Sequence, residues 1–257
     1  MAKLVNALEA RPDDTFIEIG PGRGALTLPL AARVRRVVAV EIDRDLAAQL
    51  SEQALAGVTV LCEDVLRVDL AALVAAEAAS GGRVRIVGNL PYNISSPILF
   101  KLLELAAAGA PVHDATLMLQ REVADRLAAR PGTRDYGRLT IHAAIYADVS
   151  RLLSLPPGAF RPPPAVQSTV LRLTFHPAAV SIADPAAFDG LLRQLFGLRR
   201  KTLTNALKPL ASSKGLSAAA ILDAARLDGR RRPETLDLAE LARLQEVWVS
   251  ALPRAVL

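Results

Sequence analysis

The residues with the clearest chemical potential form one short run at the end of an apolar segment. The run is Asn89-Leu90-Pro91-Tyr92, and residues 84–88 precede it. If the Asn89 side-chain oxygen and the Leu90 carbonyl each accept one hydrogen of an exocyclic base amine, the nitrogen is drawn toward tetrahedral geometry and its lone pair points at a methyl donor. Pro91 stiffens the turn, because it fixes φ and lacks an N–H group. Tyr92 offers a ring on which the base can stack. We therefore predict that these four residues are catalytic.

A base held in this way must leave its stack and lie between flat side chains. Phe160, in the proline-rich stretch 156–164, is the candidate for the second face. We include it among the predicted catalytic residues.

A glycine-rich turn follows the first apolar segment and opens a helix. Gly20 and Gly22 allow positive φ and leave room for a ligand, and the free N–H groups at the helix start favour polar or anionic ligand groups. Glu41 lies 21 residues after Gly20, where a carboxylate can accept hydrogen bonds from both ribose hydroxyls. Asp64 ends the third apolar segment. Because Gly20-x-Gly22-x-x-Ala25 also satisfies the loose dinucleotide fingerprint, a nicotinamide enzyme fits this turn as well.

The elements that position these residues are short apolar strands separated by longer segments of helical period. This alternation is typical of βαβ units, so we predict an α/β fold with a doubly wound, mainly parallel, Rossmann-like sheet. Functional residues then lie at the carboxyl ends of the strands. The predicted strands are Phe16–Gly20, Val37–Ile42, Val58–Cys62, Val84–Gly88 and Ala115–Leu119.

The pattern changes in the second half of the chain. Arg151–Leu155 and Ser168–Phe175 read as a hairpin across the proline-rich stretch, and from Pro185 onward only helical periodicity remains. We predict a cofactor-binding domain over residues 1–178 and a small all-α, RNA-binding domain over residues 179–257.

Charge is distributed unevenly along the chain. Residues 177–257 hold 12 basic and 8 acidic residues, whereas residues 1–176 hold 19 and 18. A positive end on a near-neutral body indicates a polyanionic partner, with nucleic acid favoured over an acidic membrane.

Composition excludes several classes of site. The one cysteine, Cys62, cannot form an internal disulfide, and the three histidines show no metal-ligand spacing. The longest apolar runs fall short of the roughly 18 residues that a membrane span needs. We expect a cytoplasmic protein without a metal site, with Cys62 as a small core residue.

Five motifs, in this order, carry a resemblance to a known family. The chain is similar over essentially its whole length to the ribosomal RNA adenine dimethyltransferases, and within them to the small-subunit branch of kasugamycin-resistance methyltransferases. The motifs are Glu18-Ile19-Gly20-Pro21-Gly22, Glu41-Ile42-Asp43, Asn89-Leu90-Pro91-Tyr92-Asn93-Ile94-Ser95, Phe160-Arg161-Pro162-Pro163-Pro164 and Arg199-Arg200-Lys201-Thr202-Leu203.

The resemblance implies a class I methyltransferase fold and S-adenosylmethionine as cofactor, with Glu41 at its ribose and Asp64 at its adenine. It implies N6,N6-dimethylation of two adjacent adenosines in a hairpin near the 3′ end of 16S ribosomal RNA during small-subunit biogenesis. The predicted cofactor-binding residues are Glu18, Gly20, Gly22, Glu41, Ile42, Asp64, Val65 and Asn89.

The partner that follows is 16S ribosomal RNA within the 30S subunit or its precursor, bound by a monomer. Cations along an RNA duplex bind phosphates with a salt-sensitive affinity. The basic run Arg230–Arg232 fits either this role or a solvated helix end. The predicted RNA-binding residues are Arg134, Arg138, Arg199, Arg200, Lys201 and Asn205.

One departure from the family pattern concerns the amino terminus. Family members usually begin with a basic segment and a Gln-Asn-Phe-Leu motif that helps to close the cofactor site, whereas this chain starts at a stretch resembling the helix after it. We therefore expect this form to bind S-adenosylmethionine weakly. The rival interpretations are the large-subunit, macrolide-resistance branch, a non-catalytic assembly or transcription factor, and the nicotinamide enzyme. Leu90 and the Arg-Arg-Lys-Thr run favour the small-subunit branch.

Overall fold

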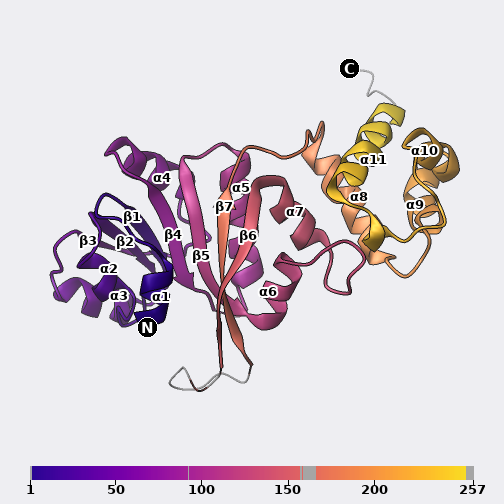
Figure 1. Ribbon diagram of the computed structural model, residues 1–257. Helices are drawn as coiled ribbons and strands as arrows, with labels where there is room; N and C mark the ends of the chain where they lie inside the picture. Colours follow the sequence, from indigo (N-terminus) through magenta and orange to yellow (C-terminus); the bar gives the residue numbers. More distant parts are fainter. Residues whose placement is uncertain (1, 92, 157, 159–165, 253–257) are drawn as a thin grey trace. The chain divides into compact units, whose positions relative to one another are not determined.

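One seven-stranded sheet contains all the strands of the computed structural model, which describes residues 2–91, 93–156, 158 and 166–252 (Figure 1). The strand order is β3-β2-β1-β4-β5-β7-β6. The first five strands are parallel, and β7 is antiparallel to both β5 and β6. The strands are β1 Thr15–Ile19, β2 Arg36–Glu41, β3 Val58–Cys62, β4 Val84–Asn89, β5 Val112–Gln120, β6 Ala147–Leu155 and β7 Ser168–Phe175.

Helices follow the parallel strands, as the alternating pattern predicts. Asp43 begins one of them, because its side chain accepts hydrogen bonds from the N–H groups of Asp45 and Leu46, and Asp69 caps another through the N–H group of Ala72. The helices are α1 Ala2–Ala7, α2 Thr27–Ala31, α3 Arg44–Glu52, α4 Leu70–Ala79, α5 Ser95–Ala107 and α6 Arg121–Leu127. The predicted doubly wound α/β class is confirmed.

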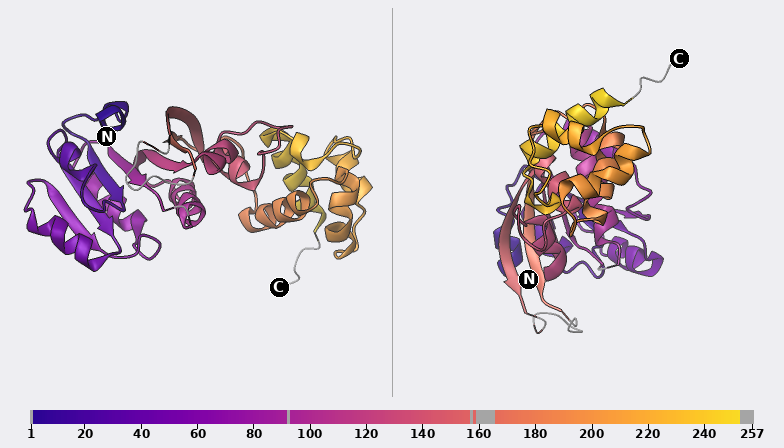
Figure 2. Two further views of the ribbon diagram at one scale, coloured as in Figure 1. Left: turned by 90° about the horizontal axis from the view of Figure 1, so that it is seen from below. Right: turned by 90° about the vertical axis from the view of Figure 1, so that its right-hand side faces the viewer.

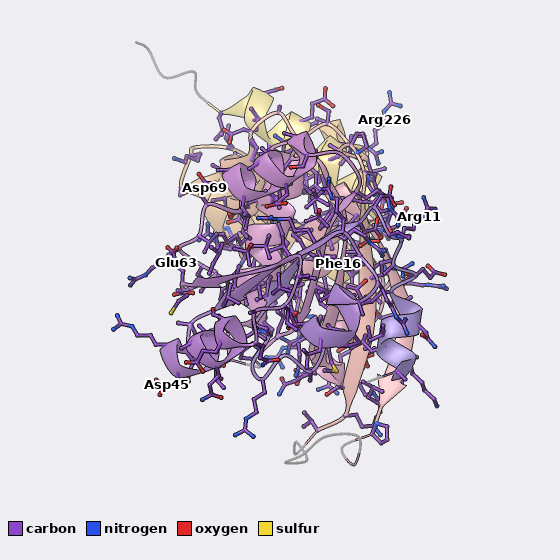
Figure 3. The ribbon with its side chains drawn as sticks, turned by 90° about the vertical axis from the view of Figure 1, so that its left-hand side faces the viewer. Arg11, Phe16, Asp45, Glu63, Asp69 and Arg226 are labelled. Carbon is purple, nitrogen blue, oxygen red and sulfur yellow. The ribbon has the colours of Figure 1, made fainter. Side chains whose placement is uncertain are left out.

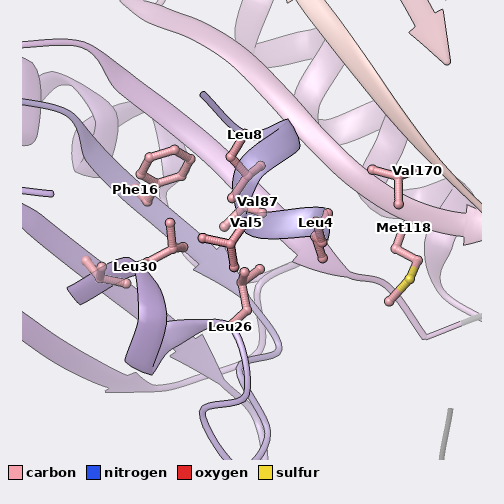
Figure 4. Packing of buried hydrophobic residues seen from close by; sticks show 10 residues of the cluster. Leu4, Val5, Leu8, Phe16, Leu26, Leu30, Val87, Met118 and Val170 are labelled. Carbon is pink, nitrogen blue, oxygen red and sulfur yellow. The ribbon is translucent and has the colours of Figure 1, made fainter. Parts of the chain in front are cut away.

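A buried apolar cluster fixes one face of the sheet against α1 and α2. Side chains alternate between the faces of a strand, so the neighbouring Phe16 of β1 and Val87 of β4 point to the same side. Figure 4 shows them with Leu4 and Val5 of α1 and with Leu26, which directly precedes α2. Each of these five residues is buried. The loop before α2 follows β1 directly, so it lies at the carboxyl edge of the sheet.

A network of paired charged side chains is buried near the amino ends of the parallel strands. The Arg85 guanidinium donates to both Asp114 carboxylate oxygens, at 2.9 and 2.8 Å, and to Asp14 at 3.2 Å. Arg85, Asp14 and Asp114 are each 2% exposed or less. Arg172 of β7 donates to the Ala7 carbonyl and so secures the end of α1. This paired network keeps buried charges satisfied and anchors α1 on the side away from the carboxyl ends of the parallel strands.

The chain divides into two compact units. The first comprises residues 1–128 and 146–177, and the second comprises residues 129–145 and 178–257. The orange to yellow part of the chain in the second unit is helical (Figure 2). Its helices are α7 Arg138–Tyr146, α8 Pro185–Gly197, α9 Leu203–Ser212, α10 Ala218–Ala224 and α11 Leu238–Ala251, with a 3₁₀ turn at Pro233–Thr235.

This division differs from the predicted domains, in which residues 129–145 belong to the first domain. Tyr136 is buried and donates its hydroxyl to the Leu236 carbonyl at 2.8 Å. Arg138 pairs with Asp189 at 2.6 Å. These long-range contacts tie residues 129–145 to the helical unit.

Cys62 departs from expectation as well, because it is exposed instead of lying in the core. It ends β3, which is an edge strand of the sheet. Figure 3 shows Phe16 inside the sheet region, whereas Glu63, which follows Cys62, lies at the periphery. Among the described residues, no helix is long and apolar enough to cross a membrane, and no cluster of three or more His, Cys, Asp or Glu side chains is arranged to hold a metal.

Candidate active site

The parallel strands bring the predicted chemical residues to one edge of the sheet. Gly20 follows β1, and its N–H group donates to the Val40 carbonyl of β2 at 2.9 Å. On the other side of β1 lies β4, with Ile19 opposite Gly88. A Cβ atom on Gly20 would lie 4.0 Å from the Asn89 carbonyl oxygen. The glycine turn and the Asn89 run are therefore direct neighbours.

The glycine turn needs backbone conformations that other residues rarely adopt. Gly20 has φ of +67° and Gly22 has φ of +56°. The N–H group of Gly22 donates to Glu41 Oε2 at 3.0 Å. The hydrogen bond to this carboxylate of β2 therefore fixes the position of the turn.

Glu41 is fixed between two loops. Its Oε1 atom accepts the Asp43 N–H group at 3.0 Å, while Oε2 accepts that of Gly22. Glu41 is 6% exposed. Each carboxylate oxygen has two lone pairs, so this side chain can accept further hydrogen bonds at the edge of the sheet. Such an acceptor pair suits the two hydroxyls of a ribose.

Glu18 lies beneath the glycine turn, where it is 2% exposed. Its Oε2 atom accepts the Thr27 hydroxyl of α2 at 2.7 Å. Burial raises the pKa of Glu18 to about 7, with a further contribution from the charge of Glu41 and an opposing one from Thr27. This geometry favours a supporting role under the turn, and a direct contact of Glu18 with cofactor stays a prediction.

The end of β3 supplies a second acidic position beside an exposed apolar side chain. Asp64 Oδ1 accepts the Leu66 N–H group at 2.9 Å, which shapes the turn before α4. Val65 is buried and Ile42, directly after Glu41, is 67% exposed. Because large apolar side chains are costly to expose, Ile42 offers a ready surface for a flat ligand ring.

Sequence reasoning missed Lys101, which holds this turn from α5. Its Nζ atom donates to the Leu66 carbonyl at 2.8 Å and to the Val68 carbonyl at 2.6 Å. The helix α5 begins directly after the Asn89 run, so one side chain ties the Asp64 turn to the element that follows the predicted catalytic loop. A lone lysine within an apolar helix was the available signal.

Asn89 is the last residue of β4, and Leu90 and Pro91 follow it directly. Asn89 is exposed, and its side-chain amide makes no hydrogen bond with the described residues. Leu90 is 1% exposed, and its N–H group donates to the Met118 carbonyl at 3.2 Å. Pro91 accepts the Ile94 N–H group at 3.2 Å and stays exposed. Tyr92 and Phe160 lie outside the described residues, so their predicted stacking roles stay predictions.

Gly88 is a second residue that sequence reasoning did not single out. A Cβ atom there would lie 2.9 Å from the Ile19 carbonyl oxygen and 3.0 Å from Leu90 Cδ2. Any side chain would push β1 and β4 apart at the level of the site. The signal was a glycine inside a predicted strand, which marks a close backbone approach.

The helical unit contains the predicted RNA-binding residues. Arg199 is engaged within the protein, because it pairs with Glu234 at 3.3 Å and donates to the Arg134 carbonyl at 2.8 Å. Arg138 is likewise paired with Asp189. The side chains of the other four are exposed and make no polar contact with the described residues: these are Arg134, Arg200, Lys201 and Asn205.

The chain is similar to known proteins over most of its length. The family model "Ribosomal RNA adenine dimethylase" matches residues 1–244. The protein named "Ribosomal RNA small subunit methyltransferase A" from Xanthomonas euvesicatoria pv. vesicatoria (strain 85-10) is 46% identical over 248 residues, which cover 95% of this chain and 89% of the relative. The protein of the same name from Xanthomonas axonopodis pv. citri (strain 306) is 45% identical over the same shares.

Two solved structures are similar across almost the whole chain. A dimethyladenosine transferase from Plasmodium falciparum has a TM-score of 0.79 at 23% identity, over 97% of this chain and 94% of that one. The 23S rRNA methyltransferase ErmE has a TM-score of 0.64 at 26% identity, over 96% and 95%. Both support the fold deduced from the sequence.

Proposed function

The chain belongs to the ribosomal RNA adenine dimethylase family, and from that premise we propose that it transfers methyl groups from S-adenosylmethionine to two adjacent adenosines near the 3′ end of 16S ribosomal RNA. The products are N6,N6-dimethyladenosines, made in the cytoplasm on the small subunit or its precursor. The observation that carries the proposal is the 4.0 Å approach of the Gly20 Cβ position to Asn89, which sets a cofactor turn beside an amine-binding loop.

The residues at the edge of the sheet fit the cofactor. Glu41 offers paired acceptors for ribose hydroxyls, Asp64 an acceptor for the adenine amine, and Ile42 an exposed apolar surface for the ring. The glycine turn leaves room for the methionine part. When bound, S-adenosylmethionine supplies an electrophilic methyl group.

The chain contributes orientation to the reaction. Adenine N6 is a weak nucleophile because its lone pair is delocalised into the ring. The Asn89 oxygen and the Leu90 carbonyl accept its two hydrogens, which localises the lone pair on nitrogen and aims it along the line of attack. In such a transfer the bond between the methyl carbon and the sulfonium sulfur would break as the N–C bond forms, with its electron pair left on sulfur in S-adenosylhomocysteine. Both oxygens would stabilise the cationic nitrogen until its proton passes to water.

The substrate is tested with isolated ribosomal subunits. Labelled methyl groups from S-adenosylmethionine should enter unmethylated 30S subunits and appear as dimethyladenosine, with 50S subunits as the control. Incorporation into 50S subunits alone would assign the chain to the large-subunit reaction instead. Absence of incorporation into either subunit, with RNA binding retained, would favour a non-catalytic assembly factor.

A further inference from the structure

A hollow of about 490 Å³ lies beyond the site described so far, at the carboxyl end of β5. It belongs to the same unit as Asn89. The proposed mechanism assigns no role to its lining. The described lining residues are Gln120, Arg121, Glu122, Asp125, Val166 and Gln167.

Strand pairing places this hollow beside the Asn89 run. Asn89 lies opposite Met118 of β5, and Gln120 is two residues further along that strand. With strands about 4.8 Å apart and a rise of about 3.3 Å per residue, the Cα atoms of Asn89 and Gln120 are roughly 8 Å apart. One unstacked nucleotide of a splayed RNA strand spans such a distance. A nucleotide next to the target therefore reaches the hollow.

The charges around the hollow disfavour a phosphate. Two carboxylates line the hollow, those of Glu122 and Asp125, and Glu122 pairs with Arg126. Arg121 donates to Gln167 Oε1 at 3.1 Å and lies 3.6 Å from Asp125. Arg151 pairs with Asp125 at 2.7 Å. The cations are thus engaged within the protein, so a neutral group suits the hollow better than an anion.

The groups left for a ligand are amides and one apolar side chain. The Gln120 side chain makes no hydrogen bond with the described residues, and Gln167 keeps its Nε2 donors. Val166 is 41% exposed. A glutamine amide can pair with adenine through one donor and one acceptor, while an aliphatic side chain packs against the ring face. These features match a purine base with an exocyclic amine.

We propose that this hollow holds the adenine adjoining the target adenosine, read by Gln120 and packed on Val166. The inference rests on the proposed function, since it assumes an RNA with two adjacent adenosines. It makes the hollow a specificity subsite: occupancy by the neighbour sets the register of the strand and presents the other adenosine to Asn89.

The test pairs protein variants with RNA variants in a methylation assay. The RNAs are the hairpin with both adenines and two hairpins in which one or the other adenine is replaced by purine, which lacks the amine. For wild type, we expect one purine RNA to raise KM about tenfold with little change in kcat. Gln120→Ala should raise KM to the same degree with the intact hairpin, and the purine RNA should add nothing further. Gln49→Ala, an exposed amide on α3, serves as the matched control.

Fluorescence titration measures the binding affinity of the same protein variants for the same RNAs, independently of turnover. Val166→Asp is a second variant, expected to weaken binding of the intact hairpin about tenfold as well. Additive effects of Gln120→Ala and purine, or wild-type KM in Gln120→Ala, would overturn the subsite. Failure of the proposed function looks different, because wild type would then bind the hairpin without methylating it.

Discussion

At the scale of single residues, Asn89 carries the clearest catalytic assignment. Its side chain is exposed at the edge of the sheet and has no partner among the described residues, so its amide oxygen is available to an incoming base. We expect Asn89→Ala to lower kcat about 10²- to 10³-fold, since the variant lacks one preorganised hydrogen-bond acceptor for the reacting amine. RNA affinity should stay within about twofold of wild type, because phosphate contacts dominate binding. Single-turnover methylation with an RNA titration measures both, and Gln49→Ala serves as the control. Equal loss of affinity and rate would contradict the assignment.

Glu18 makes stability depend on pH. The carboxyl group is protonated in the folded protein up to a pKa of about 7, against an ordinary value of 4.5. Its raised pKa therefore stabilises the fold at low pH, and that contribution is lost between pH 4.5 and about 7. Above this range, the ionised group costs about 3 kcal/mol.

Glu18→Gln should remove that cost, since a neutral amide can still accept the Thr27 hydroxyl. We expect the free energy of unfolding of the variant to exceed that of wild type by about 2–3 kcal/mol at pH 8 and by less than about 1 kcal/mol at pH 5. Urea unfolding at the two pH values checks this. If the free energy of unfolding changed with pH in the same way for the two proteins, the pKa of Glu18 would not be raised in the folded state.

At the scale of elements, α5 connects the two halves of the site. Lys101 donates from α5 to the carbonyls of Leu66 and Val68, in the turn that Asp64 opens. Lys101→Met should loosen that turn and weaken S-adenosylmethionine binding about tenfold, about 1.4 kcal/mol, while kcat at saturating cofactor changes little.

Calorimetric titration and saturation kinetics together check this expectation. Lys101→Arg should restore part of the affinity, because a guanidinium can reach the same carbonyls. Lys3→Met, an exposed lysine of α1, is the control. A fall in kcat without a change in cofactor affinity would show that Lys101 acts on the catalytic turn instead.

Among the elements, the sequence predicts the parallel strands but not the long-range contacts between segments. Apolar runs bounded by turns placed β1 to β4 within a residue of their observed bounds, because buried parallel strands need such runs on both faces. The place of residues 129–145 depended on Tyr136 and Arg138, whose partners lie about 50 to 100 residues further along the chain. Local periodicity cannot report such pairings. Exposure at Cys62 likewise follows from an edge position in the sheet, which strand order determines.

At the scale of the whole molecule, the excess positive charge of the helical part determines which cations are available for RNA. A run of basic residues in the sequence suggests that all of them have the same role, yet in the structure some are paired with carboxylates and others are exposed. Arg199 is held by Glu234, and Arg231 donates to both Glu240 carboxylate oxygens, so removal of either perturbs the fold. Arg200 and Lys201 are exposed without polar contacts to the described residues. They are the cations with which phosphate contacts can be tested cleanly.

Replacement of both Arg200 and Lys201 by serine should therefore weaken RNA binding and flatten its salt dependence. Removing one cation that pairs with a phosphate reduces the slope of log affinity against log salt by about one, so we expect a reduction of about two for the pair. The double variant Lys208→Ser with Lys214→Ser removes the same charge from exposed positions of the same unit, and it should keep a steeper slope. Titrations of the 16S hairpin or of 30S subunits at several salt concentrations measure both variants. If the slope falls equally in the two double variants, the net charge of the helical unit, and not a defined phosphate site at Arg200 and Lys201, governs binding.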